Sequence, residues 1–426
     1  MKKRFLPLLS LCCLTLIAGC NNEPTSLSSV FSFEESSESQ ESRPSRIDAQ
    51  KLVSDRALVK WEGRYEYQLG DLNTPTMVYL YHTATGFSID FYGTSLTVGF
   101  YHYLNEKETT DIYYDFALDE ETLPNPVEGR RFSLSKDKMG EEITLINGLK
   151  EGHHHLKCLK MNEAIDAYTG ITSFQTDGYF FYRDEIEDTS RLKFLAVCAS
   201  GGSGFGSLGY STVSKTAITK TRANSSSLHA FNYLTARRFA ADIHFVATSG
   251  WGVHYPENHA IPEILDYCGN TPKNSVSAAK KTGKWDPKNY VPDVILFNIG
   301  GNDTGNASFD VNIYKESVVQ MVNKLRGYYP KAKMLWTHTG SKAGGYAINA
   351  LTQSQAISDG YVTEVVVPNV GEGETGEGTY GASNHASLKT HLDIEHILVD
   401  TLQSKFHYQP TVDDISFEQF ESFLDQ

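Results

Sequence analysis

The sequence predicts two folded domains, an all-β sandwich followed by a three-layer α/β domain with a parallel sheet. Short alternating apolar and polar runs, separated by turn residues, fill residues 48–186 without a long helical pattern, which is typical of an antiparallel sandwich. Over residues 187–407, apolar strand-like runs alternate with amphipathic helical stretches. That order indicates parallel strands joined by crossover helices.

The first 20 residues are typical of an export signal. They combine a basic tip, an apolar run too short to span a bilayer comfortably, and the sequence Ile17-Ala18-Gly19-Cys20. The segment resembles a bacterial lipoprotein signal peptide, in which Cys20 is lipidated and becomes the first mature residue. An ordinary cleaved signal peptide is the alternative. We therefore expect an extracytoplasmic protein, anchored to the membrane at the bacterial cell surface only through Cys20.

Residues 21–47 are rich in serine and glutamate and poor in apolar side chains, which predicts a flexible linker. The chain carries 38 lysines and arginines against 52 aspartates and glutamates, a formal charge of −14. An acidic surface repels nucleic acid and anionic lipid and suits a neutral partner. Beyond the signal only Cys158, Cys198 and Cys268 remain, and their spacing indicates neither a disulfide framework nor a zinc site.

The sandwich is expected to use six principal strands, at residues 87–93, 95–103, 111–118, 130–135, 141–148 and 153–161. Trp61, Tyr65 and Tyr67 could stack on a sugar ring, although aromatic residues in strands more often belong to the core. In His153–His155 strand alternation sends the middle imidazole to the opposite face, and no carboxylate or cysteine is grouped with the other two in sequence. We therefore expect no metal site there.

The α/β domain is expected to have parallel strands at residues 194–198, 243–248, 294–299, 333–338 and 363–367, with helices at 226–241, 311–329 and 388–406. The second helix carries an apolar stripe that should face the sheet and stops before Pro330. The stripe consists of Ile313, Val318, Met321, Val322 and Leu325. An acidic C-terminal tail, residues 408–426, has no assigned role.

One apolar strand ends in a glycine-rich turn that holds Ser200, Ser203 and Ser207. Glycines let the chain turn sharply and present a hydroxyl at the carboxyl end of the strand, where open α/β sheets bind their ligands. A nucleophilic serine also needs a base and donors for an oxyanion. Candidates follow later strands: Ser249–Gly252, Gly300–Asp303, and His385 in the turn Gly381–His385.

Residues in this order resemble the SGNH (GDSL-like) hydrolases, and more closely the family 2 carbohydrate esterases, which join a small β-sandwich to an SGNH domain. The resemblance covers about residues 58–405 and is strongest over Trp285–Asp303. It implies a jelly-roll sandwich and an SGNH hydrolase domain. It also implies that Ser203 is the nucleophile, that His385 is the base, and that Ser203, Gly250 and Asn302 form the oxyanion hole.

Two departures from the family pattern affect the expected mechanism. The family's first motif reads Gly-Asp-Ser, whereas here the residues are Gly201-Gly202-Ser203, and the acid expected two residues before the histidine is Ser383. The resemblance then implies a Ser-His dyad, in which a backbone carbonyl holds the ring, with Ser383 as the residue placed to orient it. The acidic loop 372–380 is another source of a carboxylate.

The resemblance implies an extracellular serine esterase that removes acetyl groups from poly- or oligosaccharides, with no cofactor and as a monomer. Two alternatives remain open. One is a glycan-binding surface lipoprotein that has lost catalysis, and the other is a GDSL-type lipase.

Overall fold

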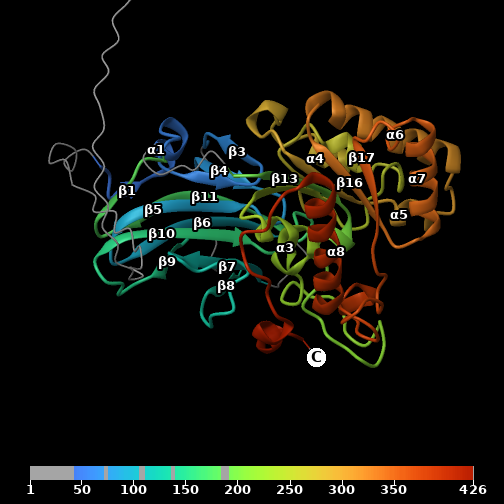
Figure 1. Cartoon of the computed structure of the whole chain (residues 1–426). Coiled ribbons are helices and arrows are strands. Elements are labelled where there is room, and N and C mark those ends of the chain that lie inside the picture. Colours follow the sequence, from blue (N-terminus) through green and yellow to red (C-terminus); the bar gives the residue numbers. More distant parts are fainter. Residues whose placement is uncertain (1–42, 72–74, 105–110, 136–139, 184–190, 426) are drawn as a thin grey trace, which may run out of the picture. The chain divides into compact units, whose positions relative to one another are not determined.

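The computed structural model describes residues 43–71, 75–104, 111–135, 140–183 and 191–425 (Figure 1). The signal peptide, Cys20 and most of the predicted linker lie outside the described residues, as does the predicted boundary between residues 186 and 187. Residues 46 and 47, which end the predicted linker, form strand β1 (Arg46–Ile47) and pair with a sandwich strand. The folded part therefore begins slightly earlier than predicted.

Two antiparallel sheets make up the N-terminal part, in agreement with the predicted all-β class. The first has the order β3-β4-β11-β6-β9 with β1 beside β11, and the second has the order β12-β5-β10-β7-β8 with β2 beside β5. The strands are β2 (Lys60–Glu62), β3 (Tyr65–Gln68), β4 (Met77–Leu80), β5 (Gly86–Gly93), β6 (Leu96–Leu104), β7 (Ile112–Leu118), β8 (Arg131–Leu134), β9 (Glu142–Ile146), β10 (Gly152–Lys160), β11 (Ala167–Thr176) and β12 (Tyr179–Phe180).

A five-stranded parallel sheet follows, with the order β14-β13-β15-β16-β17. Its strands are β13 (Lys193–Cys198), β14 (Asp242–Ala247), β15 (Val294–Asn298), β16 (Lys333–His338) and β17 (Val362–Val366). All five coincide with the predicted apolar runs. Every strand in this sheet runs in the same direction, so the turns after β13, β14 and β15 meet at one edge.

The helices are α1 (Ala49–Ser54), α2 (Ser200–Ser203), α3 (Phe231–Arg238), α4 (Val276–Ala279), α5 (Gly301–Thr304), α6 (Val311–Tyr328), α7 (Lys342–Gln353) and α8 (Leu388–Phe406). Short 3-10 turns are η4 (Ser227–His229), η5 (Ile261–Ile264), η6 (Pro287–Asn289), η7 (Ala382–Asn384) and η8 (Phe417–Phe423). Helix α7 was not predicted from the sequence. Among the described residues, no helix combines the length and the apolar character that a membrane crossing needs.

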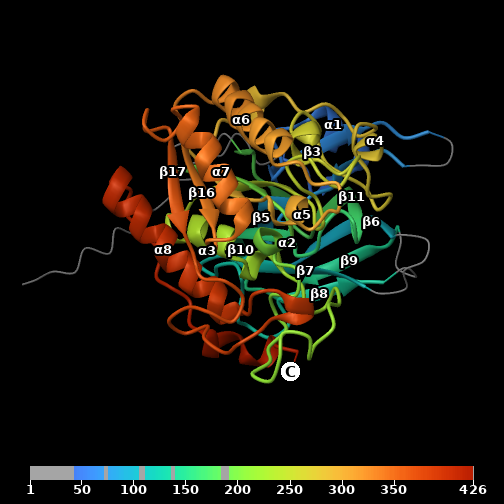
Figure 2. The ribbon, with the colours of Figure 1, turned by 90° about the vertical axis from the view of Figure 1, so that its right-hand side faces the viewer.

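The helices cover both faces of the parallel sheet (Figures 1 and 2). Leu195 and Val197 of β13 pack with α6 and α7, while Phe194, Ala196 and Cys198 pack with α3 and α8. A strand that is buried on both faces needs apolar residues at every position. This explains why β13 reads as one continuous apolar run.

The apolar stripe predicted for α6 is correct except at its first position. Ile313 is 39% exposed, whereas the next residue, Tyr314, is fully buried. The Tyr314 hydroxyl donates to the backbone oxygen of Ala343 in α7. Tyr314 can take the core position because its phenol satisfies its own polar atom there.

The sandwich contacts the α/β layers through charged and polar side chains. Lys60 of β2 pairs with Asp242 at the start of β14, at 2.9 Å. The buried Arg64 guanidinium donates to the backbone oxygens of Leu265 and Tyr267. Asn162, just after β10, donates to the backbone oxygens of residues 222 and 225. The sandwich thus contacts the start of β14 and the loops that follow β13 and β14.

The C-terminal tail packs against the α/β part. Phe417 and Phe420 are buried in a cluster with Leu234 of α3 and Leu388 of α8. Backbone hydrogen bonds also join Asp425 to the chain just after the serine turn, from Tyr210 to Asp425 and from Asp425 to Leu208. The tail therefore supports the segment that follows the serine turn, although its sequence had suggested no role.

Candidate active site

The three serines of the glycine-rich turn have different environments. Ser203 is only 1% exposed, and its hydroxyl donates to the backbone oxygen of Ser200 at 3.2 Å. Ser207 is fully buried and donates to the backbone oxygen of Ser226 at 2.9 Å. Ser200, the first residue of α2, is partly exposed and lines a pocket of about 190 Å³. Since a nucleophile must reach its substrate, the geometry favours Ser200 over the predicted Ser203.

The space around Gly202 also favours Ser200 over Ser203 as the nucleophile. A Cβ atom at Gly202 would lie 2.6 Å from both the Cys198 Cβ and the Asn232 Nδ2 atoms. An aspartate there would have to displace the Cys198 side chain, so the structure leaves Gly202 little room for the family's acid. With Ser200 as the serine of that motif, the preceding residue is Ala199, and the alignment assumed from the sequence is shifted by three residues.

The pocket beside Ser200 lies at the carboxyl edge of the parallel sheet. Its lining comes from the turns after β13, β15 and β16 and from the start of α7. Asn302, predicted for the oxyanion hole, is among the lining residues, together with Asn298, Thr337, His338 and Ser341. The structure therefore brings Ser200 and Asn302 to one small, mostly polar pocket.

A main-chain carbonyl holds the His385 imidazole. Its Nδ1 lies 2.9 Å from the backbone oxygen of Ser383. Because a carbonyl only accepts, Nδ1 carries the proton and Nε2 has the free lone pair. The Phe205 ring packs on the imidazole, with centroids 4.4 Å apart, and the Ala382 amide donates to the backbone oxygen of Gly206. These contacts bring His385 to the serine turn.

Within the described residues no hydrogen bond joins His385 to Ser200 or to Ser203. Such catalytic hydrogen bonds are often long before substrate binds and tighten in the complex. The tautomer already leaves Nε2 able to accept a proton.

Burial of His385 predicts activity that persists into mildly acidic solution. Burial lowers the pKa of His385 below its ordinary value of 6.5, with Lys220 adding to the effect, and the backbone oxygen of Ser383 opposes it. A base must be neutral, and a lowered pKa keeps it neutral until the pH falls through that lower value. We expect the acid limb of kcat/KM to lie below pH 6.5, measured between pH 4 and 8. A limb above pH 7 would contradict this assignment of the base.

The Ser383 side chain does not face the imidazole. Its hydroxyl accepts the Lys220 amide at 2.9 Å, and the residue has φ +49°. Ser383→Ala should therefore lower kcat by no more than about tenfold, the scale of one net hydrogen bond. A side chain that orients a catalytic histidine is worth about 10⁴-fold instead. For the same reason Ser383→Asp should give no large gain, and steady-state kinetics of both variants test this.

Asn302 and Gly250 sit on two turns that are tied to each other. The Asn302 Nδ2 donates to the backbone oxygen of Trp251 at 2.8 Å. Gly250 is exposed with φ +79°, a conformation that favours glycine. The N–H groups of Ser200 and Gly250 donate to no acceptor in the described part of the chain. Together with the Asn302 amide they are available for an oxyanion.

Asp303, which the sequence analysis did not single out, ties the same turns together. Its buried carboxylate accepts the backbone N–H groups of Val253, His254 and Tyr255 at 2.8–2.9 Å. Burial raises the pKa of Asp303, and these three donors oppose the rise. The position of Asp303 immediately after Asn302, beyond a buried strand, was the available sequence signal. The sandwich residue Glu163 was also missed and reaches the Ser249 turn.

Several aromatic residues are structural. Trp251 and Trp336 are fully buried. Trp61 is also buried, packs on Tyr65, and donates its indole N–H to Tyr67. These three sandwich aromatics therefore belong to the core and not to a sugar platform. In the acidic loop after β17, no carboxylate reaches the His385 Nδ1 atom, which the Ser383 carbonyl already holds.

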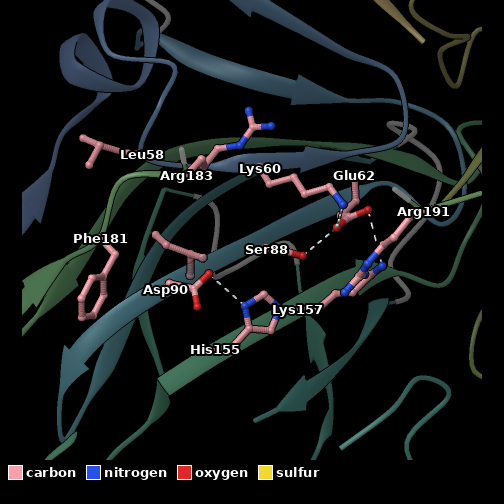
Figure 3. A pocket seen from close by; sticks show the side chains of 11 residues that line it. Leu58, Lys60, Glu62, Ser88, Asp90, His155, Lys157, Phe181, Arg183 and Arg191 are labelled. Carbon is pink, nitrogen blue, oxygen red and sulfur yellow. Dashed lines mark hydrogen bonds and ion pairs between the residues drawn. The ribbon is translucent and has the colours of Figure 1, made fainter. Parts of the chain in front are cut away.

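A larger cavity of about 280 Å³ lies on the sandwich (Figure 3). Its central carboxylate, Glu62, accepts the Ser88 hydroxyl and lies 3.7 Å from Lys60 and 3.4 Å from Lys157. Burial alone would raise the pKa of Glu62, but these cations and the hydroxyl hold it well below its ordinary value. Its serine and its histidine, Ser88 and His155, are bonded to Glu62 and Asp90 and not to each other. The smaller pocket, which Ser200 and Asn302 line, is therefore the better candidate for the chemistry.

The three consecutive histidines alternate as predicted, but a carboxylate does accompany two of them. Asp90 of β5 lies 2.9 Å from both the His153 Nε2 and the His155 Nδ1 atoms, while His154 pairs with Asp119. Strand pairing in space, not sequence, brings Asp90 there. Elsewhere in the described chain Glu395, His396 and Asp414 come close enough to share an ion. Arg238 already contacts both of those carboxylates.

Comparison with known proteins relates the chain to carbohydrate esterases. No protein-family model matches the sequence. The cellulase/esterase CelE of Acetivibrio thermocellus is 24% identical over 370 residues, which are 84% of this chain and 41% of CelE. The chain thus spans about two fifths of the length of this curated relative.

Solved structures show the same fold. A family two carbohydrate esterase from Clostridium thermocellum, in complex with cellohexaose, has a TM-score of 0.66 at 22% identity, covering 82% of this chain and 99% of that chain. The acetyl xylan esterase Est2A from the rumen bacterium Butyrivibrio proteoclasticus has a TM-score of 0.67 at 17% identity, covering 85% and 98%. The resemblance to family 2 carbohydrate esterases predicted from the sequence is thus confirmed.

Proposed function

We propose that this protein is an SGNH-type serine esterase that removes acetyl groups from carbohydrate. The observation that carries the proposal is the meeting of Ser200 and Asn302 in one pocket at the carboxyl edge of the sheet. His385, whose tautomer is fixed by the Ser383 carbonyl, packs on Phe205 of the same serine turn. The similarity to carbohydrate esterases over more than four fifths of the chain supports it.

In the proposed reaction, the Ser200 hydroxyl attacks the acetyl carbonyl and passes its proton to the His385 Nε2 atom. The oxyanion is held by the N–H groups of Ser200 and Gly250 and by the Asn302 amide. The carbon–oxygen bond to the sugar breaks, and the sugar hydroxyl leaves with the proton from His385. Water, deprotonated by the same imidazole, then releases acetate from Ser200. No carboxylate takes part, so His385 and Ser200 act as a dyad.

The pocket favours a small acyl group. Its volume of about 190 Å³ and its asparagine, threonine, histidine and serine lining suit an acetyl group on a polar sugar. A long lipid chain needs a larger apolar channel, which argues against the GDSL lipase alternative. CelE is named a cellulase/esterase and Est2A an acetyl xylan esterase. We infer by extension that plant-type β-glucans and xylans carrying acetyl groups are the first substrates to test.

The proposed location is the bacterial cell surface, with a lipid on Cys20 as the membrane attachment. The sequence Ile17–Cys20 after a basic, apolar segment motivates this. Metabolic labelling with palmitate tests it. Label on the full-length protein that is lost in Cys20→Ser, with release of that variant into the medium, is the expected result. Wild-type protein that carries no label would contradict the proposed lipid anchor.

Hydrolysis assays separate the proposed function from its alternatives. We expect release of acetate from acetylated xylan and from p-nitrophenyl acetate, with rates that fall steeply for butyrate and longer esters. Rates that rise with chain length would favour a lipase. If wild-type protein releases no acetate but binds xylan or cello-oligosaccharides by calorimetry, the chain is a glycan-binding lipoprotein without catalysis.

A further inference from the structure

A buried carboxyl from the sandwich reaches the turns that carry the proposed catalytic groups. Glu163 follows β10 by three residues and is buried. Its Oε1 atom accepts the Ser249 amide at 2.9 Å, and its Oε2 atom accepts the Ser249 hydroxyl. Ser203, whose hydroxyl donates to the Ser200 backbone oxygen, lies close enough to Glu163 to lower the pKa of that carboxyl. One carboxyl thus binds the turn of Gly250 and lies near the turn of Ser200.

We propose that Glu163 is a positioning residue for the esterase: it fixes the Ser249–Gly250 turn against the turn that carries Ser200. This inference rests on the proposed function for its catalytic consequence. Glu163 is not among the residues that line the pocket, so it does not act on the reacting atoms itself. Its effect on the reaction passes through the positions of the Gly250 N–H group and the Ser200 backbone.

The position of Glu163 is itself fixed by neighbours on the sandwich. The fully buried Lys160 ammonium donates to the backbone oxygen of Tyr81, just after β4, at 2.5 Å and to that of Ala167, the first residue of β11, at 3.0 Å. Asn162 anchors the turn of Glu163 by donating to Arg222 and Ser225. A carboxyl held in this way fixes the position of the Ser249–Gly250 turn relative to the sandwich.

The surroundings of Glu163 suit an acceptor. Burial raises the pKa of Glu163, and the hydrogen bond from Ser249, the charge of Lys220 and the contact with Ser203 oppose the rise. Both Ser249 donors point at the carboxyl oxygens, and a carboxylate accepts from both of them. In Glu163→Gln the amide oxygen can still accept the Ser249 N–H, but the amide nitrogen can only donate, so the bond to the Ser249 hydroxyl must reverse its direction. The substitution therefore weakens the hold of residue 163 on the Ser249 turn.

Release of this turn should lower turnover more than substrate binding. The Gly250 N–H matters most when the carbonyl oxygen gains charge, and a shift of about 1 Å in a catalytic group can cost on the order of 100-fold in rate. We expect Glu163→Gln to lower kcat by about 10- to 100-fold and to leave KM within about twofold. Acetate release from p-nitrophenyl acetate and from acetylated xylan measures both constants.

Lys60→Gln is the matched control. Lys60 also joins the sandwich to β14, through Asp242, but at the opposite end of that strand from Ser249. Its loss weakens the contact between the two parts without touching either turn. We expect near wild-type kcat for Lys60→Gln. Equal losses of kcat in Lys60→Gln and Glu163→Gln would mean that Glu163 only holds the parts together, and would overturn the proposal.

Two further measurements keep the inference testable when folding or activity fails. Ser249→Ala removes one donor to Glu163 while keeping the backbone bond, so its loss of kcat should be smaller and should not add to that of Glu163→Gln. Hydrogen exchange of the amides at residues 249–251 should speed up in Glu163→Gln but not in Lys60→Gln. The exchange result stands even if wild-type protein hydrolyses no ester, in which case the proposed function fails separately. Unchanged exchange together with unchanged kcat in Glu163→Gln overturns the positioning role.

Discussion

Ser200→Ala is expected to abolish acetyl ester hydrolysis, with kcat lower by about five to six orders of magnitude, the scale seen when a serine hydrolase loses its nucleophile. Ser200 is the serine of the turn that lines the pocket beside Asn302. Its side chain makes no hydrogen bond in the described part of the chain, so the variant should fold and melt like the wild type. Single-turnover assays with p-nitrophenyl acetate, which detect the acyl-enzyme directly, measure the loss.

The two neighbouring serines are the controls for this result. Ser203→Ala removes the bond to the Ser200 carbonyl, so a partial loss of kcat and of stability is expected. Ser207→Ala removes two buried hydrogen bonds to the Ser226 backbone and should act mainly on stability. If Ser203→Ala is inactive and Ser200→Ala keeps most of the wild-type rate, the assignment drawn from the sequence was right and the one drawn from the pocket is wrong.

Asn302→Ala should lower kcat by about 100- to 1,000-fold while KM changes little, because an oxyanion donor acts mainly in the transition state. The Asn302 amide has two N–H groups. One donates to the backbone oxygen of Trp251 and orients the side chain, which leaves the second for the oxyanion. Initial rates over a range of acetyl ester concentrations separate the two constants.

Asn298→Ala is a matched comparison in the same pocket. The Asn298 amide donates to the Thr337 hydroxyl and lines the same cavity, so its removal should act on KM more than on kcat. A loss in Asn302→Ala that appears wholly in KM would make Asn302 a substrate contact and leave the oxyanion to the two backbone N–H groups.

The strand and helix pattern was readable from the sequence because it depends on local periodicity. The run Phe194–Cys198 is apolar at every position since helices cover both faces of β13. Asn302 was found for a similar reason, as it follows a buried strand at the edge where parallel strands meet. Helix α7 was missed because its stretch Lys342–Gln353 contains two adjacent glycines, Gly344 and Gly345, which weaken a helical pattern.

The choice among Ser200, Ser203 and Ser207 could not be made from the turn alone. All three follow one apolar strand within eight residues and are flanked by glycines, so their local sequences are nearly equivalent. The structure separates them by what packs above the turn: the sandwich residue Glu163 lies near Ser203, and Ser226 covers Ser207. When a segment far away in the sequence buries a side chain, the residues next to that side chain in the sequence do not reveal it.

The sequence by itself determined the fold class, the edge of the sheet where the chemistry is expected, and the residue types that gather there. Those depend on alternation, on glycines in turns and on strand direction, which act over a few neighbouring residues. Only the tertiary structure decided which serine lines the pocket and which backbone oxygen binds the His385 ring. It also showed that Glu163 binds Ser249. Each of these is a contact between segments far apart in the chain, Glu163 to Ser249 being separated by 86 positions, and such contacts follow from the packing of whole layers against one another.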